Sequence, residues 1–298
     1  MIADLVVIVV LVAAAIVAAC AAIMLFIRWR RNRFQFSIRA LLVSFVALSC
    51  GLFAYMHWIA PLVAHRWAIQ NIYSSGGAVL FRDDFQPGSG NIYSDPSTAN
   101  PWRGVSILHA SSDAEARNVS RDLRYLPEAD SLFLNSRVTD VGLAALCKNA
   151  DQSSIDTVDL IGSSVTAEGL SHLANFKHLR LLFVNSCPTQ DADLAALKSL
   201  PTLRDLTLIE EGKTGNPKRF TEAGFREVGQ LKQLEKLWLA NLQIPDPAAQ
   251  HLKNLTGLKK LQLSRCQISD DAIRGLRQAL PQTDFVIYRI GSDSPEKK

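Results

Sequence analysis

The chain has 298 residues, of which 48% are hydrophobic and 20% charged, and its formal net charge is +4. That charge is confined to residues 1–65, which hold five arginines and one acid, so the remaining 27 basic and 27 acidic residues cancel. A neutral remainder lacks the basic surface typical of nucleic-acid binding, so we expect no nucleic-acid partner. The length leaves room for more than one domain.

Residues 1–66 contain two apolar segments. The first, Leu5–Ile27, has 23 residues and no charge, and as a helix it would span about 35 Å, enough to cross a bilayer. The second covers residues 40–64 and ends in aromatic residues typical of a membrane interface. We therefore predict a transmembrane hairpin with spans at about 5–27 and 40–64. A removable signal peptide fits less well, because no basic region precedes the first segment and no polar stretch follows a cleavage site.

The arginines between the two segments predict the orientation. Basic residues that flank membrane spans stay on the cytoplasmic side, so both ends of the hairpin should lie outside. This places residues 66–298 on the extracytoplasmic side of a multi-pass protein in the cytoplasmic (plasma) membrane, with the lipid bilayer as a partner. If the first segment were cleaved, the second would still insert with its basic flank inside. The arginines are Arg28, Arg30, Arg31, Arg33 and Arg39.

Residues 67–127 predict a small α/β cap next to the membrane. Strands are expected at 78–81 and 105–109, and the residues between them, rich in Pro, Gly and Ser, form a loop. The sequence from Ser112 to Glu115 has the form of a capping box, which predicts a helix start. This cap would cover the open apolar end of the segment that follows, as stacked repeats require.

From Ala129 to Leu280 an apolar pattern recurs six times, with a period of about 24 residues. The first half of each unit alternates like one face of a strand, and the second half has the spacing of one face of a helix. Such a unit cannot bury its apolar edge alone, so consecutive units must stack around a shared core. Five units open with Ile155, Leu179, Leu203, Leu234 and Leu258, and their inner strand positions are Val158 and Leu160, Leu182 and Val184, Leu206 and Leu208, Leu237 and Leu239, and Leu261 and Leu263.

The helix starts are marked by hydroxyl and acidic side chains. Hydroxyl residues stand where an N-cap is needed, and the acids that follow suit the positive end of the helix dipole. In the fifth unit Pro245 takes the cap position, and Asp246 is expected to cap in its place. The hydroxyl residues are Thr139, Thr166, Thr221 and Ser269, and the acids are Asp140, Glu168, Glu222, Asp270 and Asp271.

These columns, together with Cys187 and Cys266 in the Asn/Cys column, resemble the leucine-rich repeat family. The resemblance implies an α/β fold: a right-handed superhelical solenoid over residues 128–290, with a parallel sheet on the concave face and helices outside. It implies binding more often than catalysis. The chain departs from the family pattern in the Asn column, held elsewhere by Ser163, Glu211 and Leu242, and in extra residues near 210–219. Phe285 and Ile287 should add a terminal strand, and we expect residues 291–298 to be a disordered tail.

Motifs for chemistry are missing from the sequence. The histidines have no metal-ligand spacing, and no zinc, nucleophile-elbow or phosphate-loop motif occurs. Cys187 and Cys266 stand three repeats apart, about 14 Å at the usual strand spacing, which is too far for a disulfide. We interpret them and Cys147 as packing residues. No cofactor and no metal is expected, and the chain is not predicted to be an enzyme.

Residues between the apolar strand positions should face the concave surface. Their middle column contains three aromatic residues, which are frequent in binding hot spots. Acids gather toward the first repeats and bases toward the last. A solvated face of mixed charge, with the aromatics shielded by long neighbours, is the alternative. The predicted ligand-binding residues are Phe133, Asp159, Phe183, Arg204, Thr207, Trp238, Lys260 and Gln262.

The favoured hypothesis is a membrane-tethered recognition module that binds a protein or envelope component on this concave face, without catalysis. The alternative is a structural or assembly membrane protein, in which the transmembrane hairpin is the working part and the repeat is a spacer. An enzyme would need a site that no known motif marks.

Overall fold

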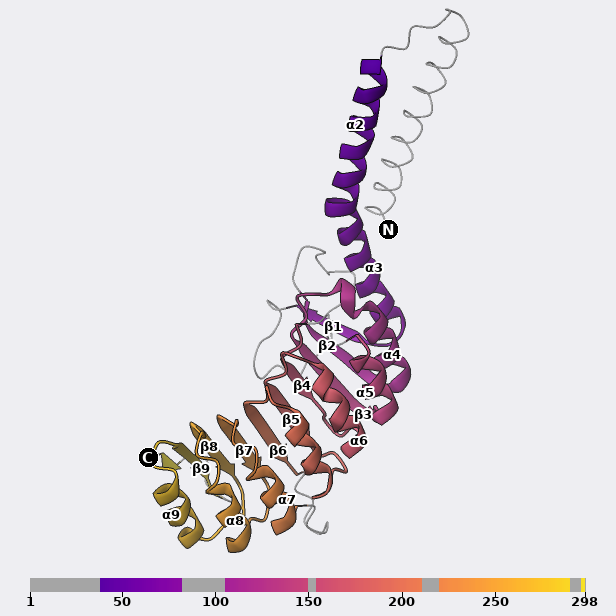
Figure 1. Ribbon diagram of the computed structural model, residues 1–298. Coiled ribbons are helices and arrows are strands. Elements are labelled where there is room, and N and C mark those ends of the chain that lie inside the picture. Colours follow the sequence, from indigo (N-terminus) through magenta and orange to yellow (C-terminus); the bar gives the residue numbers. More distant parts are fainter. Residues whose placement is uncertain (1–37, 82–104, 150–153, 211–219, 290–295, 298) are drawn as a thin grey trace, which may run out of the picture. The chain divides into compact units, whose positions relative to one another are not determined.

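The computed structural model describes residues 38–81, 105–149, 154–210, 220–289 and 296–297 (Figure 1). The chain divides into two compact units, Met1–Ala60 and Pro61–Lys298. In the second unit one ten-stranded sheet runs from β1 to β10 in chain order. Each strand therefore pairs with its neighbours in sequence, as stacked repeats require.

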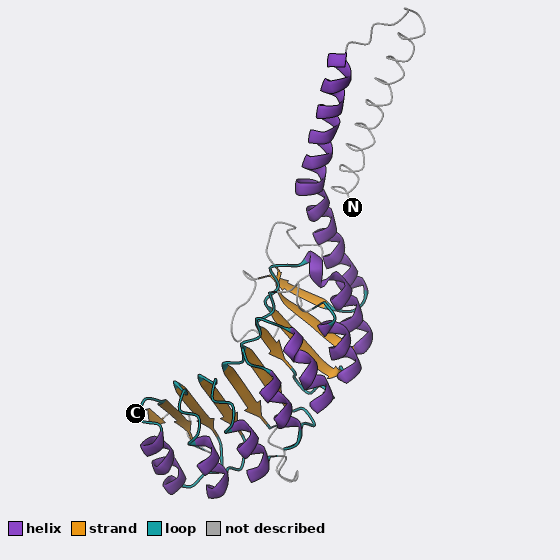
Figure 2. Cartoon of the chain, in the orientation of Figure 1, coloured by secondary structure: helices purple, strands orange, loops and turns teal. Residues whose placement is uncertain are grey.

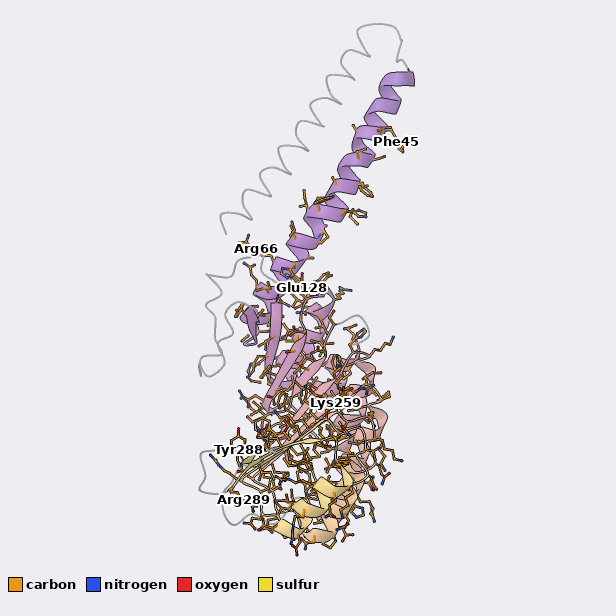
Figure 3. All side chains as sticks on the ribbon, turned by 90° about the vertical axis from the view of Figure 1, so that its left-hand side faces the viewer. Phe45, Arg66, Glu128, Lys259, Tyr288 and Arg289 are labelled. Atoms are coloured by element: carbon orange, nitrogen blue, oxygen red, sulfur yellow. The ribbon has the colours of Figure 1, made fainter. Side chains whose placement is uncertain are left out.

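The described part of the first unit is helical and apolar. It contains α2 (Ile38–Ala54), the π-helical turn η1 (Tyr55–Ile59) and the start of α3 (Ala60–Ser74). Among the described residues one helix, Phe45–Ser74, is long and apolar enough to cross a membrane by length and composition. Phe45 projects from this helix and is 70% exposed, and Trp58 is 73% exposed (Figure 3). The predicted first span, 5–27, lies outside the described residues.

The second unit begins with the remainder of α3, whose Ala68, Ile69 and Ile72 are buried. Strand β1 (Ala78–Phe81) pairs antiparallel with β2 (Val105–Ser112), and α4 (Asp113–Asp122) and the 3₁₀ turn η4 (Leu123–Tyr125) follow. The predicted capping box is present, since Ser112 Oγ accepts from Glu115 N. The apolar face that follows this helix start is buried, and it consists of Ala116, Val119, Leu123 and Leu126.

The repeats consist of parallel strands joined by helices. Their strands are β3 (Ser131–Arg137), β4 (Thr157–Asp159), β5 (Leu181–Asn185), β6 (Asp205–Ile209), β7 (Lys236–Ala240), β8 (Lys260–Ser264) and β9 (Asp284–Tyr288). The helices between them are α5 (Asp140–Cys147), α6 (Ala167–His172) with η6 (Leu173–Asn175), η7 (Asp193–Ser199), α7 (Glu222–Val228), α8 (Asp246–Leu252) and α9 (Asp270–Ala279). The third repeat uses a 3₁₀ helix, η7, where the spacing of Leu194 and Leu197 predicted an ordinary helix face.

The stacked leucine columns form the core. Leu160 is 0% exposed, Val184 2%, Leu208 0%, Leu239 0% and Leu263 1%. All belong to one continuous cluster of buried residues, which confirms the predicted columns. Helices α4 to α9 lie on one face of the sheet (Figure 2). We call the opposite face, which carries the alternate strand residues, the open sheet face.

Strands β4, β5, β7 and β8 are each followed by a tight turn that links the strand to the next repeat. Gly162, Ser186, Asn241 and Arg265 occupy this turn with φ values of 63°, 54°, 58° and 53°. The amide of each donates to the last carbonyl of the next strand, for example Arg265 N to Tyr288 O at 2.7 Å. The thiols of Cys187 and Cys266 donate backward, to Leu160 O and Leu239 O. The Asn/Cys column therefore satisfies backbone carbonyls between repeats.

The predicted acids lie in the first turns of their helices, and one of them, Asp140, also links neighbouring repeats. Asp140 accepts from Thr166 N at 2.8 Å and from Thr166 Oγ1 at 2.7 Å, in the next repeat. Asp113 binds Thr139 in the same way, and Asp246 accepts from Ser269 Oγ. Thr139, Thr221 and Ser269 also cap their own helices, whereas Thr166 makes no side-chain cap bond. Asp246 is the first residue of α8 and not its cap, so that prediction is wrong.

The end of the chain also differs from expectation. Phe285 and Ile287 are buried in β9, as predicted. However, Glu296 and Lys297 form β10, which pairs antiparallel with β9, so the predicted disordered tail is wrong at these two residues. A short antiparallel strand covers the hydrogen-bonding edge that β9 would otherwise expose. Residues 211–219, most of the predicted insertion, lie outside the described part.

Candidate functional site: the open sheet face

The predicted middle column is aligned strand by strand. Phe133 pairs with Asp159, Asp159 with Phe183, Phe183 with Thr207, Thr207 with Trp238 and Trp238 with Gln262. Because paired residues of neighbouring strands point to the same side, all six face away from the helices. The column continues to His109 at one end and to Val286 at the other.

The exposure of this column is uneven. Phe133, Phe183, Trp238 and Gln262 are partly exposed. Asp159 is 7% exposed and Thr207 only 4%, although both were expected on the surface. The pattern had suggested that the three aromatic side chains are exposed, but they are only partly exposed. The larger side chains on the neighbouring strands cover the shorter side chains of Asp159 and Thr207. This burial therefore depends on residues that are distant in sequence.

A shallow depression of about 200 Å³ lies over β5 to β8. It brings together five of the eight predicted residues and leaves out Phe133, Asp159 and Arg204. Five further residues complete its wall and were missed; Leu206 and Leu237 among them are buried in the core. The lining residues are Leu181, Phe183, Asp205, Leu206, Thr207, Lys236, Leu237, Trp238, Lys260 and Gln262. A signal for part of this set was present in the sequence, because Leu181, Asp205, Lys236 and Lys260 all stand two residues before the middle column.

Trp238 and the charged rim are held in defined positions. The indole Nε1 of Trp238 donates to Ser264 Oγ at 3.1 Å, on the next strand. Lys236 Nζ lies 2.8 Å from Asp205 Oδ2. Lys260 has no ion-pair partner among the residues that the structure describes, so its charge is available at the rim. The depression therefore offers an apolar wall, a fixed aromatic ring and one unpaired cation.

The neighbouring charges are neutralised within the sheet. Lys259 Nζ donates to Glu235 Oε2 at 2.7 Å, and this hydrogen bond lowers the pKa of Glu235. Arg204 donates to the carbonyls of Pro201 and Leu203, so its guanidinium is engaged in its own loop. Lys259 directly precedes β8, and Tyr288 ends the neighbouring strand β9 (Figure 3). The predicted site residue Arg204 is thus not brought to the depression.

Two buried polar groups flank Phe133 along the column. Burial raises the pKa of the Asp159 carboxyl to about 7, and burial lowers the pKa of His109, against the opposing effect of Glu115. Asp159 Oδ1 and His109 Nδ1 have no hydrogen-bond partner within the described ranges. Unpaired buried polar atoms cost free energy, so this part of the face departs from what stability alone favours.

The cysteines belong to the core. Cys147 and Cys187 are buried, and Cys266 is partly exposed; all three are free thiols. Burial raises the pKa of Cys147 to about 12 and that of Cys266 to about 11. Thiols with a raised pKa are poor nucleophiles, which agrees with a packing role.

A second hollow, of about 500 Å³, lies on the helix side. It is larger than the depression on the open sheet face, but it contains no aromatic residue. Of its polar side chains, Thr139 and Asp140 are already used in bonds between repeats, and the others are Arg117, Lys148 and Glu168. We therefore place the candidate site on the open sheet face.

Parallel strands that alternate with outer helices and carry stacked leucine columns define a fold of the leucine-rich-repeat type. No family model and no curated protein matches the chain. Several solved leucine-rich-repeat structures do. An internalin (inlF) of Listeria monocytogenes is 22% identical over 55% of this chain and 49% of its own, with a TM-score of 0.35. An internalin C2 of the same species is 17% identical over 65% of this chain and 88% of its own, with a TM-score of 0.37.

The TLR13–ssRNA13 complex is 15% identical, covering 63% of this chain and 31% of its own, with a TM-score of 0.38. The match thus spans about half of the first internalin and about a third of TLR13. At these identities and TM-scores the likeness carries no argument, so the functional argument below rests on the residues of this chain.

Proposed function

We propose that this chain is a membrane-tethered recognition module that binds a protein or envelope component on its open sheet face, without catalysis. The observation that carries the proposal is the depression between Phe183 and Trp238. It combines partly exposed aromatic rings, a fixed indole and the unpaired Lys260 on a regular sheet. Aromatic anchors on a rigid surface lose little entropy on binding, which makes them frequent hot spots.

Tethering is supported by the apolar helix Phe45–Ser74. Most of the large apolar side chains from Phe45 to Trp67 along it are exposed, and the helix is long enough to cross a bilayer core. We propose that residues 66–298 lie on the extracytoplasmic side, because the arginines between the two apolar segments favour the cytoplasm. The second crossing, by residues 5–27, is part of this proposal.

The binding proposal is tested by site-directed photo-crosslinking in cells that express the full chain. A photoreactive residue replaces Gln262 on the open sheet face, and in a parallel strain it replaces Val141 on the helix side. Crosslinks to protein or cell-envelope material are expected from position 262 alone. Phe183→Ala and Trp238→Ala should each reduce the yield by a factor of about 30, since removing an anchor costs about 2 kcal/mol.

Val141→Ser is the matched control for loss of an exposed apolar side chain, since Val141 is 62% exposed on the helix side. Unchanged crosslinking in both aromatic variants would contradict the proposal. Crosslinks that depend on residues 5–64 alone would favour an assembly role for the membrane segment. Membrane sidedness is tested with an impermeant protease on intact cells, which should remove the repeats.

A further inference from the structure

Asp159 has a distinctive place on the open sheet face. Its register partners on both neighbouring strands are phenylalanines, Phe133 on β3 and Phe183 on β5. Neighbouring strands lie about 4.8 Å apart, so the carboxyl group lies in a trough between two longer aromatic side chains. The helices on the other face are separated from it by the buried residues Val158 and Leu160.

Within the described residues, nothing in this trough donates a hydrogen bond to Asp159 Oδ1. Asp159 is only 7% exposed. A buried, unpaired carboxyl destabilises the folded chain unless something outside the chain supplies donors and positive charge. A guanidinium supplies both: its planar donors match a carboxylate, and its flat faces stack against aromatic rings.

The surrounding ionisable groups do not supply that charge. On β3 and β5 the one ionisable residue is Arg137, at the end of β3, and Cys187 follows β5. His109 lies one strand beyond Phe133. At the strand starts stand Asp130, Asp156 and Arg180, of which two are acidic. Arg137 and Arg180 balance Asp130 and Asp156, so the charge that favours a cationic ligand group is that of Asp159 itself in its ionised form.

We propose that the trough formed by Phe133, Asp159 and Phe183 receives an arginine side chain of the partner protein. This inference rests on the proposed function and specifies the chemistry of the partner at one end of the open sheet face. Arginine is preferred to lysine because its guanidinium can stack between two rings while it donates two hydrogen bonds. No group within the described residues competes for the trough.

The test uses N-acetyl-arginine amide as probe and N-acetyl-citrulline amide, its uncharged isostere, as control. The full chain is reconstituted in lipid nanodiscs, and the pKa of the Asp159 carboxyl is followed by carbon NMR. The arginine compound is expected to lower this pKa by about one unit or more at saturation, because a nearby cation favours the carboxylate. The citrulline compound should leave it unchanged.

Two variants separate specific binding from general charge attraction. Asp159→Asn should abolish the arginine-dependent shifts of the Phe133 and Phe183 ring signals. Asp284→Asn, which removes an exposed carboxylate from the row beside Lys260, should retain them. Equal shifts with both compounds, or shifts that persist in Asp159→Asn, would overturn the inference.

Failure of this inference is distinguishable from failure of the proposed function. If crosslinking from position 262 still depends on Trp238 while the arginine compound does not act at Asp159, the trough has no such role and the binding face stands. If crosslinking is also independent of Phe183 and Trp238, both proposals fail.

Discussion

The carboxylate of Asp140 accepts two hydrogen bonds from Thr166 of the next repeat, one from its amide and one from its hydroxyl. A third comes from Gly169 N at 3.0 Å. Asp140 therefore joins the starts of α5 and α6, and equivalent acids join other helix pairs along the stack. Stacked repeats are only as stable as these interfaces, because each repeat contacts its neighbours alone.

Asp140→Ala is expected to lower the free energy of unfolding by about 1.5–3 kcal/mol, since it removes bonds to a charged acceptor. The measurement is urea unfolding of the full chain in nanodiscs. Glu168→Ala, which removes an exposed first-turn acid of α6, is the control and should cost about 0.5 kcal/mol or less. Equal losses in both variants would show that helix-dipole effects, and not the link to Thr166, explain the acids.

Gly229→Ala should lower the free energy of unfolding by about 1–3 kcal/mol, which is the typical cost of overpacking. A Cβ on Gly229 would lie 2.3 Å from the carbonyl oxygen of His251, which cannot move without shifting α8. Gly275→Ala is the control, because its nearest atom is the flexible Lys253 Nζ at 3.1 Å. That variant should gain up to about 1 kcal/mol from helix propensity. A tolerated Gly229→Ala would mean that the α7–α8 packing is looser than described.

Arg265→Gly should stabilise the chain by about 0.5–1 kcal/mol. Arg265 has φ 53°, a conformation that costs a residue with a Cβ but not glycine. Thermal or urea unfolding measures the gain. Arg274→Gly, in the interior of α9, is the comparison and should lose about 1 kcal/mol, because glycine is unfavourable within helices. A loss in both variants would show that the Arg265 side chain contributes more than its backbone costs.

Asp159 should make stability depend on pH. Its pKa is raised from 3.8 to about 7 in the folded chain, so between these values the folded state binds more protons than the unfolded state. Stability contributed by the protonated carboxyl is therefore fully present below about pH 4 and is lost as the pH rises toward 7. The loss is on the order of 4 kcal/mol at most, at 1.36 kcal/mol per pKa unit.

The measurement is urea unfolding from pH 4 to pH 8, comparing the wild type with Asp159→Asn. The variant should match the wild type near pH 4 and exceed it at pH 8. If the unfolding free energies of the two proteins differ by the same amount at every pH, the carboxyl of Asp159 titrates near its ordinary value in the folded chain.

The repeat pattern predicted the strands and the buried leucines, and the resemblance to the leucine-rich repeat family implied the parallel order. This follows because inner strand positions alternate and helix positions recur every three or four residues, so the same residues are apolar in any stacked arrangement. The alignment of the middle column was also predicted correctly, since strand alternation determines which face a residue takes, whereas the burial of Asp159 and Thr207 was not predicted. Thr139, Thr221 and Ser269 cap their helices as their position in the pattern predicted.

What only the tertiary structure decided is how residues of different repeats meet. Three features depend on residues from different repeats, which are about 24 residues or more apart in sequence. They are the burial of Asp159 and Thr207, the depression between Phe183 and Trp238, and the bond from Thr166 to Asp140. The periodicity of one repeat carries no information on the length of the side chains in the next repeat. Differences in length between the side chains of neighbouring strands determine whether a hollow forms between them. The local pattern therefore determined the framework, and stacking determined the surface that the framework presents.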